Sequence, residues 1–188
     1  MQTLFPIEPL FPDGFSYSDD FISTEEEADL LGSIKGFKLD PFLFQGYEAK
    51  RRVASFGFDW NFDKRVLTKG KPIPEAFLPL IEKTAVHLSI PVQSIGELLL
   101  TEYPAGAVIN WHRDAPPFET IIGISLLSDC VFKLRPHEKA EQARKRTITL
   151  PVRRRSLYIM SGPSRSDWQH SILPVKSTRY SITIRTLK

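Results

Sequence analysis

The sequence RYSITIR at residues 179–185 alternates polar and apolar side chains along its whole length. A period of two is typical of a β-strand, because successive side chains of a strand point to opposite faces of the sheet. One face of this strand therefore carries Arg179, Ser181, Thr183 and Arg185. Two interpretations fit such a face: an edge strand with solvated arginines, or an anion held by guanidinium groups that pair with carboxylates.

The chain before this strand, from Ile95 onward, consists almost entirely of short β segments. We expect strands at 97–103, 107–111, 121–127, 130–134, 146–150, 156–160, 167–172 and 179–186. Short strands of this number, separated by turns, suit a double-sheet jelly roll. The polar segment 136–145 is expected to be a surface loop, because its charged side chains cannot all be buried.

Two helices are expected before the β segments. Ser23, with Glu26 three residues later, has the form of a capping box, so a helix is predicted at about 24–34. A second helix is predicted at 74–89, where Pro79 indicates a kink or a late start. The pattern as a whole predicts an α+β fold.

The chain has 188 residues, a length that suits one compact domain burying roughly 70% of the surface of its unfolded chain. Its one cysteine, Cys130, cannot form a disulfide within the chain, so a reducing cytosol or nucleus is the expected setting. Separately, we expect the protein to be a monomer. Residues 1–12 lack a basic start and a continuous apolar run, so no signal peptide is predicted. No segment is long and apolar enough to predict a membrane span.

The basic residues are clustered, although the net charge is only +3. The clusters are Lys50-Arg51-Arg52, Arg144-Lys145-Arg146 and Arg153-Arg154-Arg155. Such clusters can bind phosphates without sequence preference, and they can equally be an ordinary solvated surface.

His112-Arg113-Asp114 and the later His170 are candidate metal ligands. If residues 107–114 are extended, His112 and Asp114 leave the same face of one strand and can reach one metal ion. Two imidazoles and one carboxylate are the ligand set of non-haem Fe(II) oxygenases. The alternative is an ordinary hydrogen-bonded His/Asp pair.

Together these residues resemble the signature of the AlkB family of 2-oxoglutarate- and Fe(II)-dependent dioxygenases. That signature combines His-x-Asp, a distal His and a terminal strand with two arginines, and Tyr103-Pro104-Ala105-Gly106 is similar to its lead-in to the metal strand. The resemblance covers residues 50–188. It implies a double-stranded β-helix (jelly roll) with helices packed on one sheet. Residues 1–95 would hold the N-terminal helices and a substrate-lid segment, and 96–188 the catalytic core.

Carried over position by position, the resemblance implies roles for the residues of this chain. His112, Asp114 and His170 would bind Fe(II) and carry the catalysis. Arg179 would pair with the far carboxylate of 2-oxoglutarate, and Arg185 would face the carboxylate nearer the metal. Further cosubstrate contacts would come from Tyr103, Thr101, Ser181 and Thr183, although Thr101 and Ser181 stand where the family usually has Asn.

The segment 51–62 is similar to the family's substrate lid, with a basic residue, a Phe-Gly turn and aromatics. An enzyme that acts on a base must unstack it and hold it between flat side chains. The candidate substrate contacts are Arg51, Arg52, Phe58, Trp60 and Phe62. Alternating aromatics on a strand can equally be core residues, which is the interpretation for Trp111 and Trp168, whereas His87 and His137 are expected at the surface.

The activity that the resemblance implies uses Fe(II), 2-oxoglutarate and O2 to remove alkyl groups from damaged DNA or RNA bases, with release of formaldehyde, succinate and CO2. The alternatives are an AlkB-like oxygenase acting on tRNA bases or on a protein side chain, or a non-catalytic binding module on the same scaffold. The basic clusters favour nucleic acid over protein as the partner.

Overall fold

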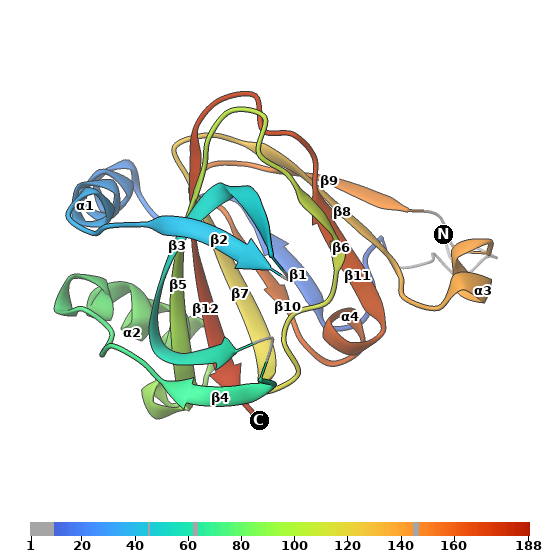
Figure 1. Ribbon diagram of the computed structural model, residues 1–188, viewed down its shortest axis with the longest axis horizontal. Coiled ribbons are helices and arrows are strands. Elements are labelled where there is room, and N and C mark those ends of the chain that lie inside the picture. The colour runs from blue at the N-terminus through green and yellow to red at the C-terminus, as the bar shows by residue number, and fades with distance from the viewer. Residues whose placement is uncertain (1–9, 45, 62–63, 145–146) are drawn as a thin grey trace, which may run out of the picture.

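Two antiparallel sheets lie face to face in the computed structural model, which describes residues 10–44, 46–61, 64–144 and 147–188 (Figure 1). The larger sheet has the order β1-β10-β7-β12-β5-β3-β2, with β4 paired to β3, and the smaller one has the order β6-β11-β8-β9. The strands are β1 (Phe15–Ser18), β2 (Asp40–Phe44), β3 (Tyr47–Asn61), β4 (Val66–Lys69), β5 (Ile95–Tyr103), β6 (Ile109–His112), β7 (Phe118–Leu126), β8 (Cys130–Pro136), β9 (Ile148–Val152), β10 (Leu157–Met160), β11 (Trp168–Ile172) and β12 (Arg179–Leu187).

All eight strands predicted from Ile95 onward are present, with ends that differ from the prediction by a few residues. Strand β12 lies inside the larger sheet, between β5 and β7. The arginines of RYSITIR are therefore not on an edge strand, and the interpretation as solvated edge arginines is wrong. The described residues before Ile95 contain four further strands, β1 to β4.

Helices α1 (Thr24–Lys35) and α2 (Leu78–Leu88) cover the outer face of the larger sheet (Figure 1). Ser23 caps α1 with the predicted capping box, in which the N–H of Glu26 donates to the Ser23 hydroxyl. A 3-10 turn, η1 (Glu75–Phe77), precedes α2, and Pro79 lies in the first turn of α2. The helix therefore starts late, as one of the two predictions for Pro79 had it, and is not kinked. Proline is tolerated in the first turn because the N–H that it lacks would have no partner within the helix there.

The apolar side chains form two cores. One lies between the helices and the larger sheet and includes Leu98, Leu100 and Ile184. The other lies between the two sheets and includes Phe118, Phe132 and Ile172. Successive side chains of β5 and β12 point alternately into one core and then the other. The polar side chains on the inner face of these strands therefore lie between the two sheets.

Segment 136–145 is not only a loop, because it contains the one-turn helix α3 (Lys139–Gln142). Gln142 stabilises it by donating to the carbonyl oxygen of Pro136 at 2.9 Å. A second short helix, α4 (Gly162–Ser166), precedes β11. A second 3-10 turn, η2 (Val92–Ser94), leads into β5. No helix in the described part of the chain is long and apolar enough to span a membrane.

Candidate active site

The three candidate metal ligands meet in space. His112 ends β6 and lies directly opposite His170 on β11, and Asp114 follows two residues later. One ligand atom from each residue lies within 4.8 Å of the others. Two neighbouring strands of the smaller sheet therefore deliver both imidazoles, and the turn after β6 delivers the carboxylate.

The protonation states of these three residues suit a metal. Nδ1 of His112 lies 2.8 Å from the carbonyl oxygen of Asn110, which can only accept, so Nδ1 carries a hydrogen and Nε2 is the nitrogen of this ring that can bind a metal. Burial, together with the neighbouring His112, lowers the pKa of His170 to about 3, so its ring is neutral. Burial alone would raise the pKa of Asp114, but the surrounding cationic groups, Arg185 foremost, together hold that pKa well below its usual range.

An orphaned oxygen supports the fit to a cation. Oδ2 of Asp114 is buried and has no hydrogen-bond partner among the described residues, and Nε2 of His170 lies 3.4 Å from it. Buried polar atoms normally have a partner. A carboxylate oxygen beside two imidazole nitrogens matches the donor set of a divalent transition metal such as Fe(II).

The other oxygen of Asp114 is held by Arg185. Nη2 and Nε of Arg185 donate to Oδ1 of Asp114 at 2.7 and 3.2 Å, and Nη1 donates to Oε2 of Glu97. Glu97 also accepts a hydrogen bond from the Ser55 hydroxyl at 3.0 Å. The guanidinium of Arg185 thus joins a candidate metal ligand to a second carboxylate that the sequence patterns did not single out.

Arg179 lies at the other end of the same face of β12. Its Nε donates to the Ser125 hydroxyl at 3.0 Å, and its guanidinium lies 4.8 Å from the ring centre of Tyr103. Its Nη1 is buried without a partner, and no carboxylate pairs with it among the described residues. A buried cation with free N–H groups and aromatic walls can receive the carboxylate of a dicarboxylic acid.

The remaining predicted cosubstrate residues lie between these two arginines. Thr101 is directly opposite Ser181 in the pairing of β5 with β12, and the Ser181 hydroxyl reaches the Tyr103 hydroxyl at 3.5 Å. Thr183 follows on the same face. The sequence patterns did not single out Ser125, although the run of buried residues in β7 around this lone hydroxyl was a signal that could have found it.

Arg165 of α4 is a further residue that the sequence patterns missed. It is 9% exposed, and its Nη2 donates to the carbonyl oxygens of Asp114, Ala115 and Phe118 at 3.1, 2.6 and 3.1 Å. In the reverse direction, Arg113 donates to the carbonyl oxygen of Ser166 at 2.7 Å. The turn that carries Asp114 is therefore attached to α4 from both sides.

A cleft of about 1440 Å³ opens between the sheets over the candidate ligands. Arg51 and Trp60, two of the predicted substrate contacts, line it, and the guanidinium of Arg51 lies 3.9 Å from the ring centre of Phe42. Trp60 also packs against the core between the sheets. The inner face of β3 thus forms one wall of the cleft.

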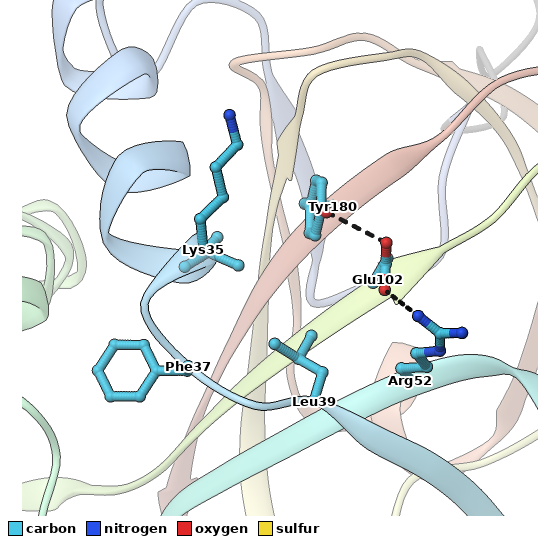
Figure 2. Close-up of a pocket in the computed structure, with 7 residues that line it drawn as sticks. Lys35, Phe37, Leu39, Arg52, Glu102 and Tyr180 are labelled. Atoms are coloured by element: carbon cyan, nitrogen blue, oxygen red, sulfur yellow. Dashed lines mark hydrogen bonds and ion pairs between the residues drawn. The ribbon is translucent and has the colours of Figure 1, made fainter.

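The structure places Arg52 elsewhere. It pairs with Glu102 across β3 and β5, at 3.6 Å, and Glu102 accepts a hydrogen bond from Tyr180 (Figure 2). These side chains border a smaller pocket beside the end of α1. Arg52 and Arg51 lie on opposite sides of the sheet because neighbouring residues of a strand point to opposite faces. Arg52 therefore lies away from the cleft, and its contact with a substrate stays a prediction.

The other predicted aromatic and histidine residues also separate. Phe58 is half-buried and does not line the cleft, and Phe62 lies outside the described residues. Trp168 packs against the core between the sheets, whereas Trp111 lines the cleft with the guanidinium of Arg135 4.3 Å from its ring centre. His87 is exposed as predicted, and His137 is half-buried.

Comparison with known proteins places this geometry in a family. The family model described as the 2OG-Fe(II) oxygenase superfamily matches residues 40–185. Two relatives are tRNA (carboxymethyluridine(34)-5-O)-methyltransferase ALKBH8 from Mus musculus, 31% identical over 88% of this chain and 25% of that protein, and RNA demethylase ALKBH5 from Bos taurus, 30% identical over 56% of this chain and 28% of that protein. The chain spans about a quarter of the length of these relatives.

The solved structure of OsALKBH1 has a similar fold. It superposes with a TM-score of 0.74 at 15% identity, and the match covers 94% of this chain and 98% of that one. An identity this low supports the likeness of fold alone. The fold and the family model agree on the region that holds the candidate ligands.

Proposed function

The chain belongs to the 2OG-Fe(II) oxygenase superfamily, among relatives of the AlkB type, and we propose that it oxidatively removes alkyl groups from bases in nucleic acid. Two features carry the proposal. His112, Asp114 and His170 lie within 4.8 Å of one another, and Arg179, on β12 of the larger sheet, is buried without a carboxylate partner among the described residues. Membership implies Fe(II), 2-oxoglutarate and O2.

In this proposal His112, Asp114 and His170 hold Fe(II), which supplies the oxidising chemistry when it is bound. Arg179 receives the far carboxylate of 2-oxoglutarate, and the hydroxyls of Tyr103, Ser181 and Thr101 complete that end of the pocket. Arg185 keeps two of its five N–H groups for the nearer carboxylate. Thr183 lies between the arginines.

The proposed reaction is balanced. An N-methyl carbon of a base, 2-oxoglutarate and O2 give the N–H base, formaldehyde, succinate and CO2. One oxygen atom enters succinate and the other enters formaldehyde, as the C–N bond breaks and the nitrogen takes a proton. The apolar and aromatic walls of the cleft would hold the base and exclude water, with Trp60 and Arg51 as substrate contacts.

The ion pairs decide which basic residues can meet a polyanion. In the cluster at 153–155, Arg153 pairs with Asp19, Arg154 with Glu27 and Arg155 with Asp20. Arg144 pairs with Glu141, and Lys145 and Arg146 lie outside the described residues. The described residues of these two clusters do not line the cleft, so they are weaker support for nucleic-acid binding than the sequence suggested.

The cleft carries the free cations instead. Lys50, Arg51, Lys71 and Arg113 line it, and none of them has an ion pair with a carboxylate of the described residues. Free cations around a deep cleft can bind phosphates on either side of an extruded base. This distribution favours nucleic acid over a protein side chain as the substrate.

The test combines turnover with binding. The protein is incubated with Fe(II), 2-oxoglutarate, O2 and N-methylated single-stranded DNA or RNA, and succinate, formaldehyde and the demethylated nucleoside are measured. We expect all three products, and none from Asp114→Ala. Succinate without any nucleoside product would contradict the assignment to nucleic acid, and a protein that binds 2-oxoglutarate but forms no succinate with any substrate would point to a binding module.

Binding is tested by salt and by matched variants. Four phosphate contacts on a single strand predict that affinity falls roughly 50-fold between about 50 and 200 mM salt. Lys50→Ala with Lys71→Ala should weaken binding and reduce this slope, whereas Arg153→Ala, in the paired cluster, should change neither. Equal effects of the two changes would contradict the role of the cleft.

The proposal includes the setting of the site. We expect one catalytic domain with the topology of a double-stranded β-helix, acting as a monomer in a reducing compartment such as the cytosol or nucleus. The buried thiol of Cys130, whose pKa burial raises, is consistent with a reduced cysteine that packs in β8.

A further inference from the structure

A buried carboxylate that the proposed reaction does not use lies beside the metal ligands. Glu97, near the start of β5, is 2% exposed. It lies directly opposite Arg185 in the pairing of β5 with β12, and opposite Gly57 in the pairing of β5 with β3. A buried carboxylate is costly unless it is paired and hydrogen-bonded, so its partners indicate its role.

Both oxygens of Glu97 are engaged. Oε2 accepts from Nη1 of Arg185, and Oε1 accepts from the hydroxyl of Ser55 at 3.0 Å. Arg185 uses its other two nitrogens on a single oxygen of Asp114, at 2.7 and 3.2 Å. A continuous series of hydrogen bonds therefore runs from β3 to the metal ligand, through Ser55, Glu97 and Arg185.

The geometry of a guanidinium explains what Glu97 adds. The group is planar and its N–H bonds have fixed directions, so a second carboxylate on Nη1 fixes the plane in which Nε and Nη2 point. With the plane fixed, Oδ1 of Asp114 is held and its partnerless Oδ2 is turned toward His170, 3.4 Å away. Without Glu97, Arg185 would have one carboxylate and could rotate about it.

We propose that Glu97 is a positioning residue that acts through Arg185 to orient Asp114 for metal binding. The inference rests on the metal site of the proposed function. It assigns Glu97 no contact with cosubstrate or substrate. Its negative charge also offsets that of Arg185, which would otherwise repel a cation held by Asp114.

The test measures metal binding without turnover. Mn(II) is titrated into the protein without O2 and followed by its electron paramagnetic resonance signal. We expect Glu97→Ala to weaken Mn(II) binding about tenfold, the equivalent of one buried charge-assisted hydrogen bond. Glu97→Gln should recover most of this loss, because its amide oxygen still accepts from Arg185.

Glu102 provides the matched control. It is a carboxylate on the same strand, paired with Arg52 on the outer face (Figure 2). Glu102→Ala should leave Mn(II) binding unchanged. Equal binding by Glu97→Ala and the wild-type protein, or equal losses in Glu97→Ala and Glu102→Ala, would overturn the inference.

A second background tests the path. In Arg185→Lys, a single ammonium cannot contact both carboxylates with the same geometry, so a further Glu97→Ala change should weaken Mn(II) binding less than twofold. A full tenfold loss in this background would show that Glu97 acts directly and would overturn the inference. A wild-type protein that does not bind Mn(II) would instead contradict the metal site of the proposed function.

Discussion

Arg179 and Arg185 lie at the two ends of β12, on the same face, and their surroundings differ. Arg185 contacts two carboxylates, Asp114 and Glu97. Arg179 is 1% exposed and contacts one hydroxyl and one aromatic ring, with no carboxylate partner among the described residues. The two ends of one strand thus hold one neutralised cation and one that is not neutralised.

This difference in partners indicates a structural role for Arg185 and a ligand-binding role for Arg179. A cation that meets its counter-ions within the protein contributes to folding, and its loss strands the carboxylates that remain. A buried cation without a counter-ion destabilises the folded chain unless a ligand supplies the negative charge. The sequence RYSITIR does not distinguish its two arginines, but their partners do.

Arg185→Met should have the largest effect on stability. It leaves Asp114 and Glu97 buried without their cation, so we expect the free energy of unfolding to fall by about 3–5 kcal/mol. Urea unfolding at pH 7 measures it. Arg52→Met removes an exposed arginine with one carboxylate partner and should change stability by less than about 1 kcal/mol. Similar losses in both variants would remove the distinction.

Arg179→Met should behave in the opposite way. Without ligand, the variant should be as stable as the wild-type protein or more stable, because an unneutralised buried charge is gone. The KM for 2-oxoglutarate should rise about 100-fold or more, because a buried carboxylate would lose its guanidinium partner. Calorimetry with 2-oxoglutarate and Mn(II)-loaded protein checks the affinity independently. An unchanged KM would show that the cosubstrate carboxylate lies elsewhere.

Arg165 is an intermediate case, a buried arginine that has carbonyl oxygens in place of carboxylates. Arg165→Met leaves the carbonyls of Asp114, Ala115 and Phe118 without this donor, so we expect a loss of about 1–3 kcal/mol in stability. Mn(II) binding should also weaken, because the turn that carries Asp114 loses its attachment to α4. An Arg165→Lys variant that recovers neither property would argue against donation to these carbonyls as the cause.

Glu27 is a paired buried carboxylate outside the cleft and gives the smallest effect. Burial alone would raise its pKa, but the Arg154 guanidinium and the N–H of Leu127 lower it below the ordinary 4.5. A depressed pKa means that the stabilisation is complete above the pKa of the unfolded state and is lost as the pH falls through the folded-state value.

Glu27→Gln should therefore be less stable than the wild-type protein by about 1–2 kcal/mol at pH 7. Thermal unfolding from pH 7 to pH 3 should show the two proteins converging as the pH falls. A difference that stays constant over this range would mean that the ionised form of Glu27 adds no stability.

Local patterns were sufficient for much of the fold. Alternation of side chains predicted the strands from Ile95 onward, and the capping box predicted the start of α1, because both depend on residues a few positions apart. The candidate metal ligands could be named for a related reason: His112 and Asp114 are close in sequence, and His170 lies in a predicted strand further along the chain. These expectations needed no knowledge of how the strands are ordered.

Long-range partners were outside the reach of those patterns. Glu97 interrupts the apolar run at 95–100, which was a signal, but its partner Arg185 follows only from the pairing of β5 with β12. Arg165 gave no local signal. The basic cluster at 153–155 looked available for phosphates, whereas Asp19, Asp20 and Glu27 from the first part of the chain neutralise it.

The sequence by itself determined which residues form the strands from Ile95 onward and which side chains are candidates for binding a metal ion, because periodicity and ligand chemistry are local properties. The tertiary structure alone decided which charges meet. Arg51 and Arg52 are neighbours in sequence, yet one lines the cleft and the other pairs with Glu102 on the outer face. Strand order and register bring distant charges together, and burial makes each pairing, or the lack of one, energetically significant.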